Sequence, residues 1–328
     1  MSNKEHTLMD DRLKMARERS WRRFGKVIGF YLPGIFSLDG HSGKYPAISI
    51  TGAACALECD HCQGKILASM EDASDPEKLV EICRRLDARR HLGVLISGGC
   101  NAEGKLPWEE FLPAIRQIKA ETGLFVSIHS GLVGEAEAAA LKDAGVDQAL
   151  IDVIGDDDTF RQVYHVPFGV ERIEASLAAL DLAGLPMVPH IVCGLHYGKI
   201  RGERRAIEML KPYKVLQLVF VSLMGIPHTP MWKVSTPMPD AVAELIAEAR
   251  LALPDTLISL GCARERGNVT MEMLAIDAGV NRMALPSEEA MLHARKYGLD
   301  INFQHTCCSV AVDIPTAPWL VPEAPEPA

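Results

Sequence analysis

Eight short apolar runs alternate along this chain with segments of helical periodicity, and this alternation limits the possible folds more than any other feature. The runs are rich in Val, Ile and Leu, as is usual for strands buried on both faces of a parallel sheet. Eight such units in 328 residues predict an α/β fold, a (β/α)8 TIM-type barrel. A doubly wound sheet is the alternative, although it usually has fewer units. The predicted strands are 47–51, 93–97, 124–129, 148–154, 187–193, 215–222, 256–261 and 281–285.

The regions outside the alternating pattern predict the domain organisation. We expect residues 1–45 to form an N-terminal helix and lead-in, residues 46–312 the barrel, and residues 313–328 a Pro-rich tail that is disordered beyond Leu320. The first residues are charged and show no apolar signal segment, and no run approaches the roughly 18 apolar residues of a membrane span.

Charge and cysteine content narrow the function classes. The net charge of −9 disfavours a nucleic-acid substrate. Nine cysteines without the spacing of a secreted disulfide framework indicate a reducing, cytoplasmic setting.

A C-x3-C-x2-C triplet, Cys55, Cys59 and Cys62, directly follows the first predicted strand. Thiolates are the usual ligands of Fe–S clusters, and four are needed to close a cubane, so three leave one iron open to another ligand. The alternatives are a zinc site or three unrelated core thiols. Zinc sites usually carry a second matching cysteine pair, and none follows here. The triplet therefore predicts a 4Fe–4S cluster with an open iron.

Polar residues at the carboxyl ends of the predicted strands are candidates for the rest of the site, because TIM-barrel chemistry lies at those ends. Paired glycines let a ligand approach the backbone closely, although a plain tight turn is the alternative. By strand alternation, Ser127 and His129 share a face. For the acidic run Asp156–Asp158, capping of the following turn competes with a binding role. The candidates are Gly98, Gly99, Ser127, His129, Asp152 and, in a Gly- and Pro-rich loop, Met224.

The remaining cysteines are candidates for a second, auxiliary cluster. Buried cysteine is also a common apolar residue, and for Cys83, in the middle of a predicted helix, that interpretation is preferred. A cysteine pair near a barrel mouth is unusual packing material, which favours ligation. The candidates are Cys100, Cys193 and Cys262 at strand ends, and Cys307 and Cys308 after the last helix.

The segment TGAACALECDHC at 51–62 resembles the cluster loop of the radical S-adenosylmethionine (SAM) superfamily. Segments 131–147, 224–231, 259–267 and 277–286 resemble the biotin synthase branch, so the resemblance spans roughly residues 45–300. It implies that SAM chelates the open iron. The implied SAM contacts are the glycine pair Gly98–Gly99 at the amino group, Asp152 at the ribose, and His61 and the Met224 loop at the adenine.

The second cluster of biotin synthase is not expected in the same form. The positions that correspond to its cysteines hold Ser97, Ser127 and Val188, and only Arg264 roughly matches its arginine ligand. This departure argues against biotin synthesis itself.

Within the branch, segments 20–36, 45–52 and 60–67 and the Thr306-Cys307-Cys308 ending resemble one component of a two-protein lipoyl synthase. That resemblance implies sulfur insertion into an octanoyl chain on a small carrier protein. The implied partners are a second radical SAM component and an electron donor of the ferredoxin or flavodoxin type. Two alternatives stay open: a single-cluster, biotin synthase-like radical SAM enzyme that acts on a small molecule without sulfur insertion, and a non-catalytic Fe–S partner protein.

Overall fold

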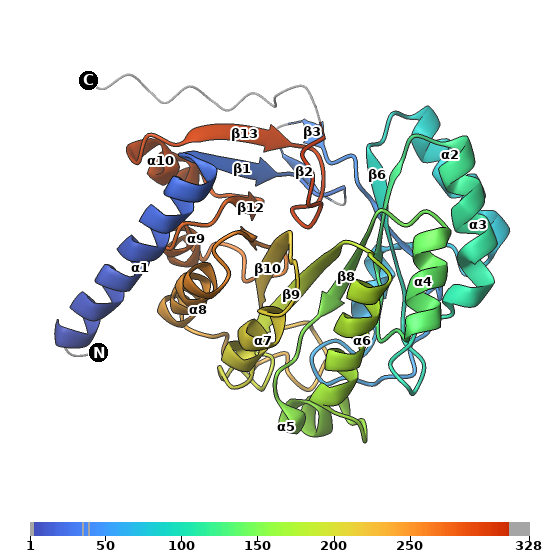
Figure 1. Ribbon diagram of the computed structural model, residues 1–328, viewed down its shortest axis with the longest axis horizontal. Coiled ribbons are helices and arrows are strands. Elements are labelled where there is room, and N and C mark those ends of the chain that lie inside the picture. The colour runs from blue at the N-terminus through green and yellow to red at the C-terminus, as the bar shows by residue number, and fades with distance from the viewer. Residues whose placement is uncertain (1–2, 35, 39, 315–328) are drawn as a thin grey trace.

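The computed structural model describes residues 3–34, 36–38 and 40–314, and its ribbon shows strands with helices on the left, below and on the right, and β13 at the top (Figure 1). The strands are β1 Val27–Tyr31, β2 Ser37–Leu38, β3 His41–Ser42, β4 Ala47–Ser49, β5 Glu71–Asp72, β6 Gly93–Ser97, β7 Phe125–His129, β8 Gln148–Asp152, β9 Met187–Cys193, β10 Gln217–Ser222, β11 Leu257–Leu260, β12 Arg282–Ala284 and β13 Asp300–Gln304. The α-helices are α1 Asn3–Phe24, α2 Pro76–Ala88, α3 Trp108–Glu121, α4 Glu135–Asp143, α5 Asp157–Thr159, α6 Val170–Leu182, α7 Glu203–Leu210, α8 Pro239–Ala252, α9 Val269–Asp277 and α10 Glu288–Lys296. A 3-10 helix, η1, spans Lys65–Ser69 and a π-helix, η2, spans Phe160–Tyr164.

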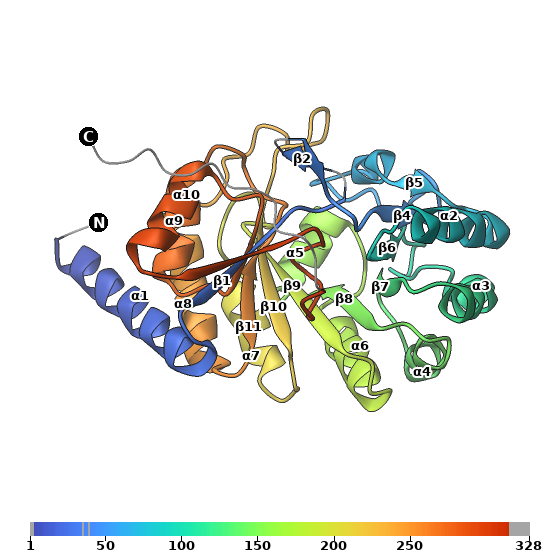
Figure 2. The same ribbon diagram turned by 90° about the horizontal axis from the view of Figure 1, so that it is seen from above.

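All eight predicted runs are strands, β4 and β6 to β12, and they pair in parallel with their neighbours in sequence order. Their apolar composition explains this, because each run is covered on both faces. Helices cover the outer face, and the ribbon seen from above shows the sheet curled around its inner face (Figure 2). An inner apolar cluster of Leu150, Val188, Val219 and Val221 lies on the concave side.

The structure differs from the predicted closed eight-stranded barrel. Its main sheet has 11 strands in the order β13-β1-β12-β11-β10-β9-β8-β7-β6-β4-β5, and its end strands, β5 and β13, are not paired with each other among the described residues. The lead-in is the cause. Residues 27–31 form β1 and pair with β12, with Gly29 opposite Arg282, so the edge that closure would use is already occupied. β13 then pairs with the other edge of β1.

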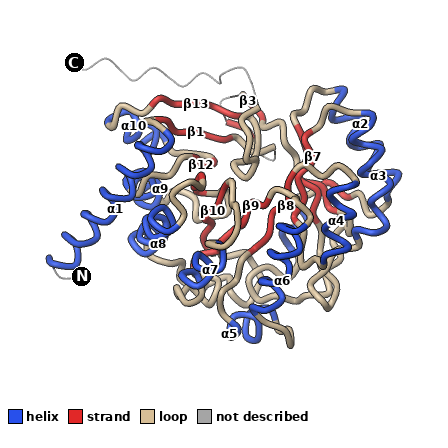
Figure 3. Tube along the Cα trace, viewed as in Figure 1, coloured by secondary structure: helices blue, strands red, loops and turns tan. Residues whose placement is uncertain are grey.

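The helices form where sequence signals place them. α2, for example, begins with Asp75 as N-cap, whose carboxylate accepts hydrogen bonds from the backbone N–H groups of Glu77 and Lys78, and Pro76 occupies its first turn. Its buried face includes Leu79 and Ile82. Figure 3 shows the same arrangement coloured by element type.

Two sequence expectations concern the rest of the chain. The expected tail lies outside the described residues from 315 onward. Within the described part, none of the helices combines the length and the apolar character that crossing a membrane requires.

Candidate functional site

A cavity of about 250 Å³ lies inside the curled sheet, toward the carboxyl ends of the strands. Its wall is mainly apolar and includes Leu95, Leu150, Val192, Val219, Val221 and Met224. Two groups of reactive side chains interrupt the wall. The first group is His61, His129, Asp152 and His190, and the second is Cys262, Cys307 and Cys308. A smaller cavity of about 110 Å³ shares His129 and Asp152 with it and also contains Gly98 and Cys100.

The cysteine triplet occupies the loop between β4 and η1. Cys59 and Cys62 are buried and Cys55 is partly exposed. Hydrogen bonds from the Cys59 thiol and from His61 lower the pKa of Cys62 to about 4, against the effect of burial, and the bond that Cys59 donates to Cys62 raises the pKa of Cys59. One thiolate is therefore already favoured in this loop, and thiolates are what Fe–S clusters bind.

The donor chemistry of the loop fits a cluster, because three cysteines lie within eight residues. His61 lines the cavity and its buried Nδ1 has no hydrogen-bond partner in the structure. No group of three or more His, Cys, Asp or Glu side chains in the described part of the chain stands ready to hold a single metal ion. A cubane differs from a single ion, because each thiolate binds a different iron and the ligands stand further apart.

Asp60, between the second and third cysteines, anchors this loop, and sequence reasoning missed it. Its carboxylate accepts hydrogen bonds from the Tyr197 hydroxyl at 2.5 Å and faces His165 Nε2 at 2.8 Å. Its backbone N–H donates to Val163 O at 2.9 Å, and its carbonyl accepts from Met231 N at 3.2 Å. Three later segments of the chain thus hold the loop, and a polar residue between metal ligands was the available signal.

The glycine pair lies directly against the cluster loop. Gly99 N donates to Thr51 Oγ1 at 2.7 Å, and a Cβ atom on Gly99 would stand 2.5 Å from Cys55 Cβ. Gly98 lines the smaller cavity. Only a residue without a side chain at Gly99 allows the end of β6 to approach the loop so closely.

Asp152 is the residue at which the cavities meet. His129 Nε2 lies 3.6 Å from its carboxylate, and the His129 and His190 rings are 6.0 Å apart. Burial disfavours the charged form of Asp152, but His129 and His190 outweigh it and lower its pKa to about 2. Burial likewise opposes a charge on His129, yet Asp152 raises its pKa, whereas burial lowers the pKa of His190 to about 4. The site therefore presents one carboxylate and one neutral imidazole to a ligand.

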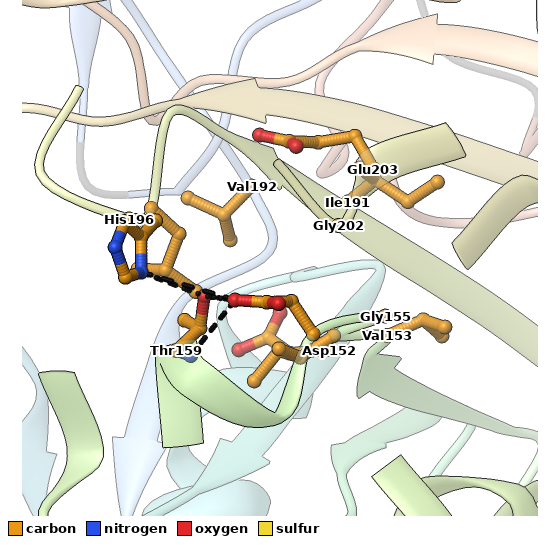
Figure 4. A pocket seen from close by; sticks show the side chains of 12 residues that line it. Asp152, Val153, Gly155, Thr159, Ile191, Val192, His196, Gly202 and Glu203 are labelled. Carbon is orange, nitrogen blue, oxygen red and sulfur yellow. Dashed lines mark hydrogen bonds and ion pairs between the residues drawn. The ribbon is translucent and has the colours of Figure 1, made fainter. Parts of the chain in front are cut away.

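A third, small pocket lies behind Asp152, between the ends of β8 and β9 (Figure 4). There Asp156 caps α5 by accepting hydrogen bonds from the backbone N–H of Thr159 at 2.9 Å and from its hydroxyl at 2.8 Å, and Thr159 Oγ1 lies 3.2 Å from His196 Nδ1. The capping role that the sequence left open for Asp156 is confirmed. Glu203 accepts a hydrogen bond from Gly194 N at 2.7 Å and so shapes the turn after β9.

The structure separates the five auxiliary-cluster candidates. Cys262, Cys307 and Cys308 line the large cavity together. Burial and the neighbouring Cys307 raise the pKa of Cys262 to about 11, and a hydrogen bond from the Cys308 thiol lowers the pKa of Cys307 to about 6. Cys100 lies instead in the smaller cavity, where burial and Cys55 raise its pKa to about 12. Cys193 is fully buried in the outer apolar cluster that faces the helices.

Two further residues have partners away from these cavities. The Ser127 hydroxyl shares a hydrogen bond of 2.8 Å with the Tyr45 hydroxyl, and Ser127 lines none of the three cavities. The Arg264 guanidinium is fully buried and forms a 2.6 Å ion pair with Glu272, so it is committed to the fold.

Comparison with known proteins finds relatives of this chain. The model of the radical SAM superfamily matches residues 49–201, which run from β4 to the loop before α7. A biotin synthase of Halorhodospira halophila is 26% identical over 247 residues, covering 73% of this chain and 74% of that protein. A biotin synthase of Pelotomaculum thermopropionicum is 28% identical over 257 residues, covering 74% and 77%.

Solved structures show the same fold. Methylornithine synthase superimposes with a TM-score of 0.62 at 16% identity, covering 88% of this chain and 80% of that chain. The FeFe-hydrogenase maturase of Carboxydothermus hydrogenoformans gives 0.59 at 15% identity, covering 89% and 72%. With the sequence matches, these findings show that the chain is an enzyme whose residues 49–201 are similar to the radical SAM superfamily. Among such enzymes it is related to biotin synthase, at modest identity.

Proposed function

We propose that this enzyme inserts sulfur into an octanoyl chain on a lipoyl-carrier protein, as one of the two components of a lipoyl synthase. The observation that carries the proposal is the position of Cys262, Cys307 and Cys308, which line the same cavity as His61 and Asp152. A carbon radical and a sulfur source have to meet at one carbon atom, and proximity of this kind contributes much of the rate of such reactions.

Cys55, Cys59 and Cys62 would hold the first cluster, which together with SAM would supply the radical chemistry that activates an aliphatic C–H bond. The chain itself positions the reactants. Gly99 keeps the end of β6 against the cluster loop, and the Asp152 carboxylate, which lines the cavity, would accept hydrogen bonds from the ribose. The apolar wall keeps water away from a reactive intermediate.

The second cluster, a further 4Fe–4S group, would be held by Cys262, Cys307 and Cys308 and would supply the sulfur. The donor set fits an Fe–S cluster, because three thiols line one cavity. The rest of the cavity wall is mainly apolar, as an aliphatic substrate requires. The buried hydroxyl of Ser259 lies beside Cys308 and adds a polar group to this part of the site.

The lining supports an aliphatic chain as substrate. A dry apolar cavity of about 150 Å³ already takes up benzene, and this cavity is larger. The side chain of Ile66, 46% exposed, lies both on the surface and in the cavity wall, as expected where a protein-linked chain enters. The proposal includes three partners: the octanoylated carrier, the second radical SAM component, and a ferredoxin- or flavodoxin-type reductant.

The test compares iron and sulfide contents after anaerobic reconstitution. The wild type is expected to hold about eight irons, the complement of two cubanes, and a Cys55/Cys59/Cys62→Ala variant about four. Cys83→Ala is the matched control, because Cys83 is a buried cysteine in α2, outside the cavities. An octanoyl-lysyl peptide, supplied with SAM and a reductant, should give 5′-deoxyadenosine and a product heavier by sulfur.

Loss of all iron in the triple variant would contradict the proposal. That result would favour the alternative, a single-cluster, biotin synthase-like radical SAM enzyme that acts on a small molecule without sulfur insertion. Iron binding without SAM cleavage by the wild type would instead indicate a non-catalytic partner protein.

A further inference from the structure

Three polar side chains lie at the first positions of three alternate strands of the curled sheet. They are Gln148 in β8, Gln217 in β10 and Arg282 in β12, and each is at least 95% buried. Inward-facing layers of parallel barrels are usually filled by Val, Ile and Leu. Polar groups at such depth destabilise a fold unless each has a hydrogen-bond partner, so this layer requires an explanation.

The partners are backbone groups of the segment that follows β13. Gln148 Nε2 donates to Ser309 O at 2.7 Å, and its Oε1 accepts from Ala311 N at 3.0 Å. Gln217 Nε2 donates to Cys308 O. Four consecutive residues, 308–311, are thus held by side chains instead of by a backbone ladder, because Arg282 takes the remaining carbonyls.

Arg282 connects the anchors to one another. Its guanidinium donates to Gln217 Oε1 at 2.6 Å, to Val310 O, and to Ala311 O at 3.3 Å. It also donates to the Asp313 carboxylate at 2.9 Å, which accepts a second hydrogen bond of 2.9 Å from the Tyr31 hydroxyl. The whole polar layer is satisfied by a piece of chain more than 25 residues away in sequence.

The segment 305–313, which we name the strap, therefore lies inside the curve of the sheet. Figures 1 and 2 both show the red chain after β13 turned into the middle of the molecule. The strap has no helix or strand of its own. His190 Nε2, from β9, meets the Ser309 hydroxyl at 2.9 Å, so the strap also touches the lining of the cavity.

We infer that Gln148, Gln217 and Arg282 are positioning residues that hold the strap and thereby place the Cys307 and Cys308 thiols beside Cys262. The inference deepens the proposed function and rests on it for the identity of the bound group. The hydrogen bonds carry the positioning role itself. Without the anchors, the strap carbonyls would be buried and unpaired, so the strap would leave its place instead.

The experiment uses the full-length protein in two forms: with Cys55, Cys59 and Cys62 replaced by alanine, and as the reduced, metal-free chain. Arg282→Met and Gln217→Leu each remove an anchor while keeping the approximate size of the side chain. Arg250→Met is the matched control: Arg250 is also fully buried and also donates to backbone carbonyls, Thr256 O at 2.6 Å and Pro254 O at 3.4 Å, but not to the strap. Comparison with Arg250→Met therefore separates a general loss of stability from release of the strap.

The first readout is iron bound by these variants when Cys55, Cys59 and Cys62 are alanines, so that only the second site counts. The control is expected to keep about four irons per chain, and each anchor variant fewer than about one. Full iron in both anchor variants would overturn the inference. If the parent without anchor changes binds no iron, the proposed function fails, and the second readout decides the inference alone.

The second readout is the rate at which a maleimide modifies the peptide that contains Cys307 and Cys308 in the reduced, metal-free chain. Modification of a buried thiol follows local opening. Loss of one anchor should increase the rate about tenfold, which corresponds to about 1.4 kcal/mol. Cys83, buried in α2, is the internal reference. Equal rates in Arg282→Met, Gln217→Leu and Arg250→Met would refute the positioning role.

Discussion

Replacement of Gly99 by Ala tests how tightly the end of β6 is packed against the cluster loop. The added Cβ would stand 2.1 Å from Ala54 O, 2.5 Å from Cys55 Cβ and 2.7 Å from Cys55 Cα. Carbon atoms in good contact are about 3.5 to 4.0 Å apart, so the loop would have to move by about 1 Å. Two of these three neighbours are backbone atoms, which no rotamer change can remove.

The expected cost follows from this geometry. Overpacking of a tight interior costs about 1 to 3 kcal/mol, and this contact belongs at the upper end because the neighbours cannot rotate away. For a chain of this size, the loss corresponds to a decrease of roughly 2 to 8 °C in Tm. Because Cys55 itself has to shift, the first cluster should also assemble poorly.

The assay measures Tm of the metal-free chain and iron retained after reconstitution. Gly123→Ala is the matched control, since a Cβ there meets only Asp87 Oδ1 at 3.7 Å, and its effect should stay within about 1 kcal/mol. A Gly99→Ala protein with the Tm and the iron content of the wild type would refute the argument that the glycine is required for close approach.

Three further changes test the electrostatics of the site and its supports. Burial lowers the pKa of His190 to about 4, so the folded state binds fewer protons than the unfolded state between about pH 6.5 and 4. The free energy of unfolding should therefore fall by about 3 kcal/mol as pH decreases through that window. Urea titrations at several pH values should show that His190→Gln removes this part of the pH dependence. Arg264→Met leaves the Glu272 carboxylate buried without the guanidinium and should lower the free energy of urea unfolding by about 3 to 5 kcal/mol. Adding Glu272→Gln to the same chain should restore part of that stability. Equal stability of the single and double variants would count against the ion pair. Tyr197→Phe removes the hydrogen bond to Asp60 and should lower the free energy of unfolding by about 1.5 to 3 kcal/mol, while the far-UV spectrum stays unchanged. An unchanged urea midpoint would mean that this contact does not hold the cluster loop.

The strands were predictable because burial on both faces leaves a local trace in composition. The eight runs are apolar wherever the sheet is covered by helices outside and packed side chains inside. The edges of the sheet were not predictable in this way. β1 pairs with β12 and β13, more than 250 residues along the chain, and nothing local in residues 27–31 distinguishes a strand from an apolar lead-in.

In the candidate site too, local motifs were predictable and contacts between distant segments were not. The cysteine triplet is a local motif, and its loop could be located from spacing alone. The sorting of the other cysteines depends on which face of a strand each occupies. Cys193 is three positions from His190, so alternation already puts the two on opposite faces of β9, and the structure has His190 in the cavity and Cys193 under the helices. That signal is present in the sequence.

The polar layer beneath the cavity shows what a single sequence conceals. Gln148, Gln217 and Arg282 each stand within the first three positions of a predicted run, where a polar residue is typical of a strand boundary. Only when β8, β10 and β12 curl around one axis do these residues face the same space, and then the three have more donors than they can satisfy among themselves. A segment with free carbonyls has to enter that space, and a short segment without secondary structure has such carbonyls to offer. The buried donors of the anchors therefore need the carbonyls of the strap, and those carbonyls need the anchors. The placement of Cys307 and Cys308 follows from this pairing and not from any motif around the two cysteines.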